Sequence, residues 1–313
     1  MVKKVAALAD IHLHYSYEVS PALDGLVKPP FGDGIEYGKK LYRTLERLER
    51  EIKDGKLDEI VILGDFLDAI TGEGLNILER AYERVAGGEG EREKILEEEF
   101  QKIGDKWKTP RDTHYRNFLR AFENFERLVG KVRALSRNGK LKYIIGNHEN
   151  GNFLKRAGIG YVEEVDYGPV ILEHGHKGDS LLLVLGWSPQ HLPRILTQGS
   201  PYRRSVADRV KGVARNMVRA YGFILQELKQ QVFNNSLVRG MVYSASRKIE
   251  KMGKKPRIMG HYHMEEITPK IAVLGEYNTH GIYYIEIGKE EVSIFNGKRE
   301  IARLENGIYR KVA

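Results

Sequence analysis

The chain of 313 residues contains no cysteine, so disulfide bridges and thiolate metal ligands are both excluded. Any bound metal must therefore be held by nitrogen and oxygen atoms, a donor set that suits Mn²⁺, Fe, Zn²⁺ or Co²⁺. The sequence also lacks a run of about 18 apolar residues, so we expect no transmembrane helix. Its apolar start ends at Asp10, too early for a signal peptide, and is interpreted as a β-strand. These absences favour a cytoplasmic protein.

Negative charge is scarce in one segment. The net charge is +8, but residues 194–257 alone carry 15 Lys or Arg and 3 Asp or Glu, a local balance of +12. Apolar residues at helical spacing run from Val206 to Leu228, which is typical of a helical hairpin packed on a core or of a helix facing lipid. We interpret residues 189–255 as a basic, helical lid or cap. A second insertion is expected at 69–112, where Gly87 and Gly88 separate two helical stretches.

Short apolar runs at 2–9, 59–63 and 141–145 predict parallel β-strands, each followed at once by polar residues. Helical periodicity within 37–52 and 115–135 predicts crossover helices between them. In such a sheet, the side chains that follow the carboxyl ends of the strands share one crevice. Further strands are expected at 168–173, 181–186, 257–259, 270–274, 281–287 and 291–295.

Five clusters of metal-binding residue types occur along the chain. They are Asp10-Ile11-His12, Gly64-Asp65-Phe66-Leu67-Asp68, Gly146-Asn147-His148-Glu149, His174-Gly175-His176 and Gly260-His261-Tyr262-His263. Their order resembles the DxH, GDxxD, GNH(D/E), H and GHxH pattern of the calcineurin-like metallophosphoesterase superfamily, over residues 5 to 287. The resemblance implies one α/β domain over 1–313, a two-sheet αββα sandwich with helical insertions. It also implies an enzyme, a metal-dependent phosphoesterase.

The resemblance further implies two divalent ions held side by side, with Mn²⁺ as the favoured metal. One would be bound by Asp10, His12, Asp65 and His263, and the other by Asp65, Asn147, His174 and His261. Two cations ~3.5–4 Å apart neutralise phosphoryl oxygens and lower the pKa of a water between them. The two carboxylate oxygens of Asp65 suit the bridging position. His174 is favoured over His176 as a ligand because it follows the apolar run 170–172 and matches the position in the family pattern.

Other residues of the motifs are expected to act on the substrate. By resemblance, His148 protonates the leaving oxygen and is oriented by Asp68. The alternative is a purely structural role, in which His148 is a hydrogen-bonded histidine of the loop. Substrate contacts are expected from His14, His176, Arg203 and Arg204, and a plain surface position stays open for His14.

The superfamily pattern does not fix the substrate. Ala69 and Ile70 follow Asp68, where Ser/Thr protein phosphatases have Arg-Gly. The layout is most similar to the UDP-2,3-diacylglucosamine diphosphatase group, in which a basic helical insertion before Gly-His-x-His covers acyl chains. This chain has Gly-Asn-His-Glu where that group commonly has Gly-Asn-Arg-Asp. We expect a phosphorylated small-molecule or lipid-linked substrate, such as a nucleotide-sugar diphosphate, with peripheral contact at the inner membrane surface through 194–257.

Two alternatives stay open. The basic insertion could instead track the phosphates of a nucleic acid, which would make the chain a phosphodiesterase, a nuclease or a nucleic-acid-binding protein. A scaffold that binds no metal is the other alternative. Every ligand position is filled by a competent residue, which counts against it.

Overall fold

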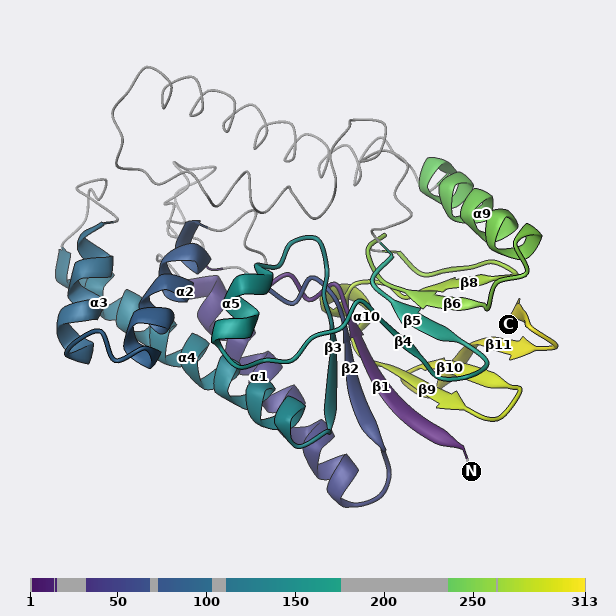
Figure 1. Ribbon diagram of the computed structural model, residues 1–313, viewed down its shortest axis with the longest axis horizontal. Helices are drawn as coiled ribbons and strands as arrows, with labels where there is room; N and C mark the ends of the chain where they lie inside the picture. The colour runs from purple at the N-terminus through teal and green to yellow at the C-terminus, as the bar shows by residue number, and fades with distance from the viewer. Residues whose placement is uncertain are drawn as a thin grey trace.

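The computed structural model describes residues 2–13, 15, 32–67, 73–102, 111–175, 236–262 and 264–312. Within them the chain has a mixed α/β fold with two mixed β-sheets (Figure 1). The larger sheet has seven strands in the order β12-β11-β10-β9-β1-β2-β3. Their bounds are β1 (Lys3–Ala9), β2 (Glu59–Leu63), β3 (Leu141–Ile144), β9 (Tyr283–Ile287), β10 (Val292–Asn296), β11 (Arg299–Glu305) and β12 (Ile308–Lys311).

The smaller sheet has five strands in the order β4-β5-β6-β8-β7. Their bounds are β4 (Glu164–Asp166), β5 (Ile171–Glu173), β6 (Arg257–Met259), β7 (Glu266–Ile267) and β8 (Ile271–Val273). Parallel pairing joins β1, β2 and β3 in the larger sheet and β5, β6 and β8 in the smaller one. Each sheet therefore has a block of strands whose carboxyl ends lie at one edge.

The helices lie outside the two sheets (Figure 1). Their bounds are α1 (Gly32–Lys53), α2 (Glu73–Ala86), α3 (Arg92–Gln101), α4 (Arg111–Arg137), α5 (Gly151–Arg156), α9 (Ser236–Lys251) and α10 (Tyr277–His280). Helices α1 and α4 pack against each other over one face of the larger sheet, and α2 and α3 contact α4. Helix α9 lies on the smaller sheet, where Val242 packs with Met259 and Val273.

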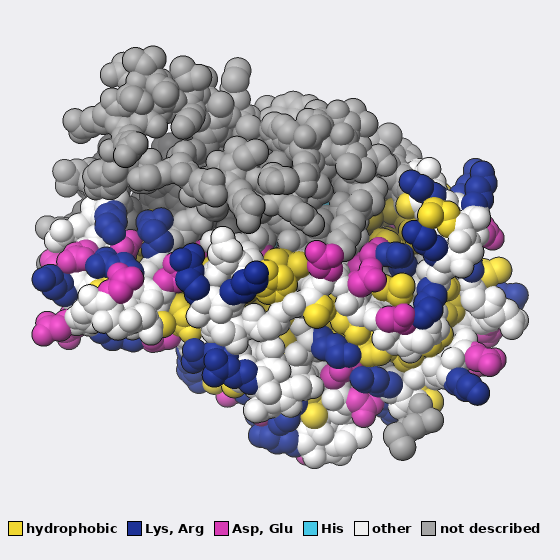
Figure 2. Space-filling view, viewed as in Figure 1, with side chains coloured by type: hydrophobic (Ala, Val, Ile, Leu, Met, Phe, Trp, Pro, Cys, Tyr) yellow, Lys and Arg dark blue, Asp and Glu magenta, His cyan; other side chains and the backbone are white. Residues whose placement is uncertain are grey.

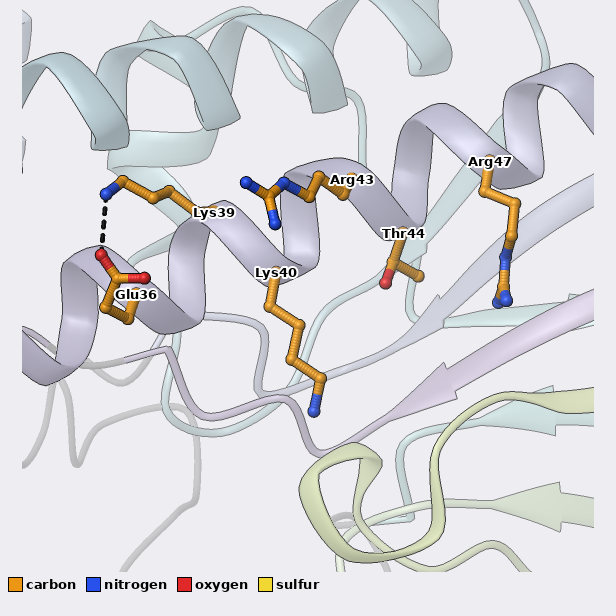
Figure 3. Close-up of a pocket in the computed structure, with 6 residues that line it drawn as sticks. All are labelled: Glu36, Lys39, Lys40, Arg43, Thr44 and Arg47. Carbon is orange, nitrogen blue, oxygen red and sulfur yellow. Dashed lines mark hydrogen bonds and ion pairs between the residues drawn. The ribbon is translucent and has the colours of Figure 1, made fainter.

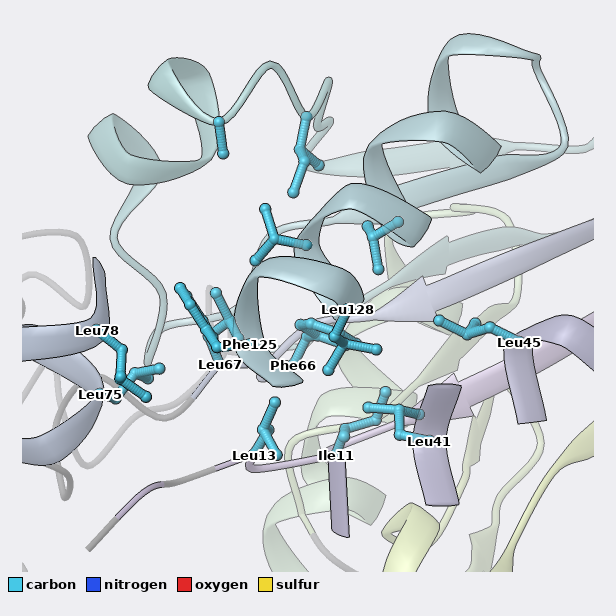
Figure 4. Packing of buried hydrophobic residues seen from close by; sticks show 14 of the residues in the cluster. Ile11, Leu13, Leu41, Leu45, Phe66, Leu67, Leu75, Leu78, Phe125 and Leu128 are labelled. Atoms are coloured by element: carbon cyan, nitrogen blue, oxygen red, sulfur yellow. The ribbon is translucent and has the colours of Figure 1, made fainter. Parts of the chain in front are cut away.

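Because successive side chains of β1 point to opposite faces of the sheet, the strand contributes to two separate hydrophobic cores. Ala6 and Leu8 point into the core beneath α1 and α4, where Leu41, Phe125 and Leu128 also lie (Figure 4). Val5, Ala7 and Ala9 point the other way, into the core between the two sheets. All of these strand residues are buried, which explains why β1 is a continuous apolar run and shows no alternation of apolar with polar residues. The order of layers is thus helices, larger sheet, smaller sheet and α9.

The predicted strands and crossover helices are confirmed wherever they fall on described residues, with ends that differ by a few positions. The predicted strand at 181–186 and the apolar stripe 206–228 lie outside the described residues. The segment 69–112 contains α2 and α3, and Gly87 and Gly88 separate them as predicted. The elements that the sequence did not predict are β4, β7, β11, β12, α5 and α10. Among the described helices, none has the length and apolar character needed to cross a membrane.

Candidate metal centre

The candidate site is assembled from the carboxyl ends of parallel strands in both sheets. In the larger sheet, Asp10 directly follows β1, Asp65 follows β2 and Asn147 follows β3. In the smaller sheet, His174 directly follows β5 and His261 follows β6. The facing edges of the two sheets therefore bring together residues that are far apart in the sequence, as the motif order predicted.

Glycines allow these loops to approach one another. A Cβ atom on Gly146 would lie 2.1 Å from Oδ1 of Asp65, and one on Gly64 would lie 2.4 Å from Nδ1 of His174. Both distances are far below van der Waals contact, so any larger residue would push the loops apart. The glycines in the motifs are thus explained by the closeness of the ligand-bearing loops.

Backbone strain is concentrated at the site. Asp10, His12, Asp65 and His261 have φ values of 48°, 49°, 47° and 71°, in the left-handed region that disfavours non-glycine residues. Only Asn306, in a hairpin turn, shares this property among the described residues. Strained residues persist where their surroundings hold them, and they gather at functional sites.

His174 lies at the centre of one candidate ligand group. Its Nε2 lies 3.0 Å from Oδ1 of Asn147 and 3.1 Å from Oδ2 of Asp65. Its Nδ1 lies 2.9 Å from the carbonyl oxygen of Leu63 and must donate to it, which directs Nε2 toward Asn147 and Asp65. Asp65, His174 and His261 are all buried and can each bring a ligand atom within 4.8 Å of the others.

A second group shares Asp65. His12 and His148 each place Nε2 at 3.9 Å from Oδ2 of Asp65, and their rings meet edge to face with centroids 4.9 Å apart. His12, Asp65 and His148 can also bring ligand atoms within 4.8 Å of one another. Asp65 therefore belongs to both groups, as expected of a bridging ligand. The sequence motif made His148 a substrate contact, whereas its position also suits a ligand.

The charges of the cluster fit a bound cation. Oδ2 of Asp10 is buried and accepts no hydrogen bond from the described residues, and Oδ2 of Asp65 is buried with His174 as its ion-pair partner. Burial opposes ionisation of Asp65, but the neighbouring His174, His148 and His12 hold its pKa well below the usual value. Burial likewise lowers the pKa of His174, but the charge of Asp65 raises it to about 10. A divalent cation would satisfy both carboxylates and take the place of that proton, so the residues present fit a metal.

The side chain of Asp10 binds the backbone of another loop in addition to carrying charge. Its Oδ1 accepts a hydrogen bond of 2.8 Å from the backbone N–H of His261 and lies 3.5 Å from Nδ1 of His174. The side chain thus ties the end of β1 to the loop after β6, with its other oxygen left for a ligand. The sequence-predicted residues His14, Asp68, His176, Arg203, Arg204 and His263 lie outside the described residues.

Glu149 is a residue that the sequence analysis quoted in a motif without assigning it a role. Its carboxylate is buried and accepts hydrogen bonds from the backbone N–H groups of Phe66 and Gly146 and from the hydroxyl of Tyr143. Burial, and then the charge of Asp65, raise the pKa of Glu149 to about 7. The only indication in the sequence that Glu149 belongs to the site was its position directly after His148 in the motif.

A hollow outside the candidate centre lies along the exposed side of α1. It has a volume of about 370 Å³ and is lined by Glu36, Lys39, Lys40, Arg43, Thr44 and Arg47 (Figure 3). Glu36 pairs with Lys39 at 2.7 Å, whereas Lys40 and Arg43 form no ion pair with any described carboxylate. The hollow is therefore a basic surface made by one helix. The sequence analysis did not predict it.

No protein-family model matches this chain, and a search of curated proteins finds no match either.

Proposed function

We propose that this chain is a metal-dependent phosphoesterase with two divalent cations in the candidate centre. The observation that carries the proposal is the position of Asp65 between two groups of imidazoles, His12 with His148 and His174 with His261. A carboxylate shared by two ligand groups can bridge two cations ~3.5–4 Å apart, the spacing of a dinuclear site. The motif order that resembles the calcineurin-like metallophosphoesterases supports the same function.

The proposed centre divides its donors between the two ions. By the sequence pattern, His12, Asp10 and His263 would bind on one side of Asp65, and Asn147, His174 and His261 on the other. His148, although it lies close to His12 and Asp65, is left for the substrate. All are nitrogen or oxygen donors, which suits Mn²⁺ and also Fe, Zn²⁺ or Co²⁺. When bound, such cations supply the positive charge that a phosphate ester needs before a nucleophile can approach it.

The protein's own side chains would handle the leaving group. The side chain of His148 is 23% exposed, whereas that of Asp65 is 1% exposed, so His148 can reach a substrate at the surface of the centre. In the proposed hydrolysis the oxygen of a water forms a bond to phosphorus while the phosphorus–oxygen bond of the ester breaks, and His148 gives a proton to the departing oxygen. The attacking water releases its own proton to solvent, from which His148 is protonated again. The backbone N–H of His148 donates to Oδ1 of Asp65 at 3.0 Å, which holds the histidine beside the reacting phosphate.

For the substrate we propose a nucleotide-sugar or lipid-linked diphosphate. The resemblance of the layout to the UDP-2,3-diacylglucosamine diphosphatase group and the balance of +12 over 194–257 support this class. The positive charge of this segment would attract both the diphosphate and an anionic membrane surface that holds a lipid-linked substrate.

The test is Mn²⁺-dependent hydrolysis of a matched panel: p-nitrophenyl phosphate, its bis-ester, a UDP-acylglucosamine and single-stranded DNA. Asp65→Asn should lower every activity that the unmodified chain shows by more than about 100-fold, since even residues behind the ligands cost ~10–100-fold. Asp166→Asn is the matched control, because Asp166 is an exposed partner of Lys255 outside the candidate centre. Full activity of Asp65→Asn would overturn the proposal, and selective turnover of the UDP-acylglucosamine would support the diphosphate class.

The second candidate function is a phosphodiesterase or nuclease. The basic hollow on α1 favours it, because Lys40 and Arg43 are available to phosphate groups. On the described part of the face seen in Figure 2, basic and acidic side chains are interspersed. Turnover of the bis-ester and DNA, weakened steeply by salt, would favour this candidate over the diphosphatase.

A further inference from the structure

Glu149 joins the two loops that carry the central ligands of the candidate centre. It lies in the loop after β3, and its Oε1 accepts a hydrogen bond of 2.5 Å from the backbone N–H of Phe66 in the loop after β2. Its Oε2 accepts from the backbone N–H of Gly146 in its own loop. Phe66 is adjacent to Asp65 in the chain, and Gly146 is adjacent to Asn147. One carboxylate therefore fixes the peptide next to each of two candidate ligands.

The link between these loops is reciprocal. While Glu149 reaches across to Phe66, Asp65 reaches back and accepts a hydrogen bond of 3.0 Å from the backbone N–H of His148. Each loop thus sends one buried carboxylate to a backbone amide of the other. We call this pair of contacts the carboxylate link.

The carboxylate link stabilises a strained backbone conformation at Asp65. Asp65 has a φ of 47°, which is unfavourable for any residue with a Cβ atom. The backbone N–H that follows it, on Phe66, is the one that Glu149 binds. Loss of that acceptor would leave Asp65 free to relax out of the left-handed region, and its carboxylate would turn away from the imidazoles.

A carboxylate suits this position better than a neutral amide. The groups that face Glu149 are all donors: two backbone N–H groups and the hydroxyl of Tyr143 at 3.0 Å. An ionised carboxylate accepts from all of them, whereas a glutamine would place its own N–H₂ group against one of these donors. A buried, unmatched donor is costly, so glutamine should loosen the link although it fills the same space.

We propose that Glu149 is a positioning residue for the metal centre, which holds Asp65 and Asn147 in ligating geometry through the carboxylate link. This inference rests on the proposed function. It adds a residue that contacts neither metal nor substrate and acts through the backbone of its neighbours.

The experiment measures Mn²⁺ binding by calorimetry, with ion stoichiometry by mass spectrometry and with kcat and KM on p-nitrophenyl phosphate. Glu149→Gln should bind Mn²⁺ about 10–100-fold more weakly than the unmodified chain, the range seen for residues that orient ligands. Its kcat should recover in part at saturating Mn²⁺, with KM little changed. Tyr143→Phe removes one donor to Glu149 and spares the carboxylate link, so its Mn²⁺ affinity should stay within about 3-fold.

Glu79→Gln is the matched control. Glu79 in α2 is also a buried glutamate; it contacts the side chain of Asn150, the residue after Glu149, at 3.5 Å but takes no part in the carboxylate link. It should bind Mn²⁺ like the unmodified chain. Wild-type affinity and stoichiometry in Glu149→Gln would overturn the inference.

Two further outcomes have fixed meanings. If Glu149→Gln does not fold, as judged by circular dichroism, Glu149→Asp decides: weakened Mn²⁺ binding by this folded variant supports the inference, and unchanged binding overturns it. If the unmodified chain binds no Mn²⁺, the proposed function fails and the inference fails with it. If the unmodified chain and Glu149→Gln bind equally, only the role of Glu149 is lost.

Discussion

Asp65 and Glu149 are both buried acids of the same two loops, yet only one of them could be assigned from the sequence. Asp65 belongs to a pattern of side chains with known ligand chemistry, and its partners His12, His148 and His174 are in the pattern too. The partners of Glu149 are mainly backbone N–H groups, which every residue has. A pattern of side chains cannot predict such contacts, because they depend on how closely the loops approach.

The position of His148 suits two roles, metal ligand and proton donor. Its Nε2 is as far from Oδ2 of Asp65 as that of His12, at 3.9 Å. We expect His148→Ala to keep its full complement of Mn²⁺ and to lose turnover most on alkyl esters, whose poor leaving group needs the proton. Turnover of p-nitrophenyl phosphate should fall less.

Metal analysis of the purified variants checks this prediction, with His174→Ala as the comparison. His174 is fully buried among acceptors, so its loss should cost bound metal. An equal loss of metal from His148→Ala would make His148 a ligand and would remove it as the proton donor.

At the scale of elements, local sequence predicted the pieces that form apolar runs or periodic helices and missed the more polar ones. The apolar runs of β1, β2 and β3 and the periodic stretches of α1 and α4 carry enough residues for a clear pattern. Strands such as β4 and β7, with 3 and 2 residues, are too short for one and are defined by their neighbours in the sheet. Hairpin strands β11 and β12 could have been found. Asn306 and Gly307 between them both have positive φ, as an Asn-Gly turn predicts.

The contact between α2 and α5 predicts a pH effect on stability. Glu79 is buried there, with one oxygen 3.5 Å from Nδ2 of Asn150 and the other without a hydrogen-bond partner among the described residues. Burial raises the pKa of Glu79 to about 8 in the folded chain, from 4.5. A raised pKa means that its contribution to stability is full below about pH 4.5 and is lost as the pH rises through about 8.

Glu79→Gln should therefore match the unmodified chain near pH 5 and exceed its stability near pH 9 by on the order of a few kcal/mol. Urea unfolding at the two pH values measures the difference, and subtraction of the two chains removes the contribution of other groups such as Glu149. A variant that is less stable at pH 9 would show that Glu79 is ionised and paired in the folded state.

At the scale of the whole molecule, the candidate ligands come from two sheets. Asp10, Asp65 and Asn147 extend from the larger sheet, and His174 and His261 from the smaller one. Periodicity predicts strands but not which strands share a sheet, so the two-sheet arrangement was expected only from the family resemblance. A cation bound by both sets would join the sheets and stabilise the entire fold.

Metal removal should therefore lower the thermal unfolding midpoint. For one site saturated at ~100 times Kd, binding adds about 2.7 kcal/mol, and a second ion adds more. We expect Mn²⁺ to raise Tm by several degrees over the chain in EDTA, measured by calorimetry. Asp65→Asn should show little of this shift, and a full shift in that variant would place the bound Mn²⁺ elsewhere.

The position of β1 in the larger sheet has a consequence for biosynthesis. β1 lies between β2 and β9, and Asp10 accepts its hydrogen bond from His261, 251 residues later in the chain. A ribosome delivers β1, β2 and β3 well before β6 and β9, so one edge of β1 stays unpaired while most of the chain is being made. Such an edge invites association between nascent chains. Loading of the proposed metal centre would have to wait for synthesis of β6 and the His261 loop after it, which would make it a late step in maturation.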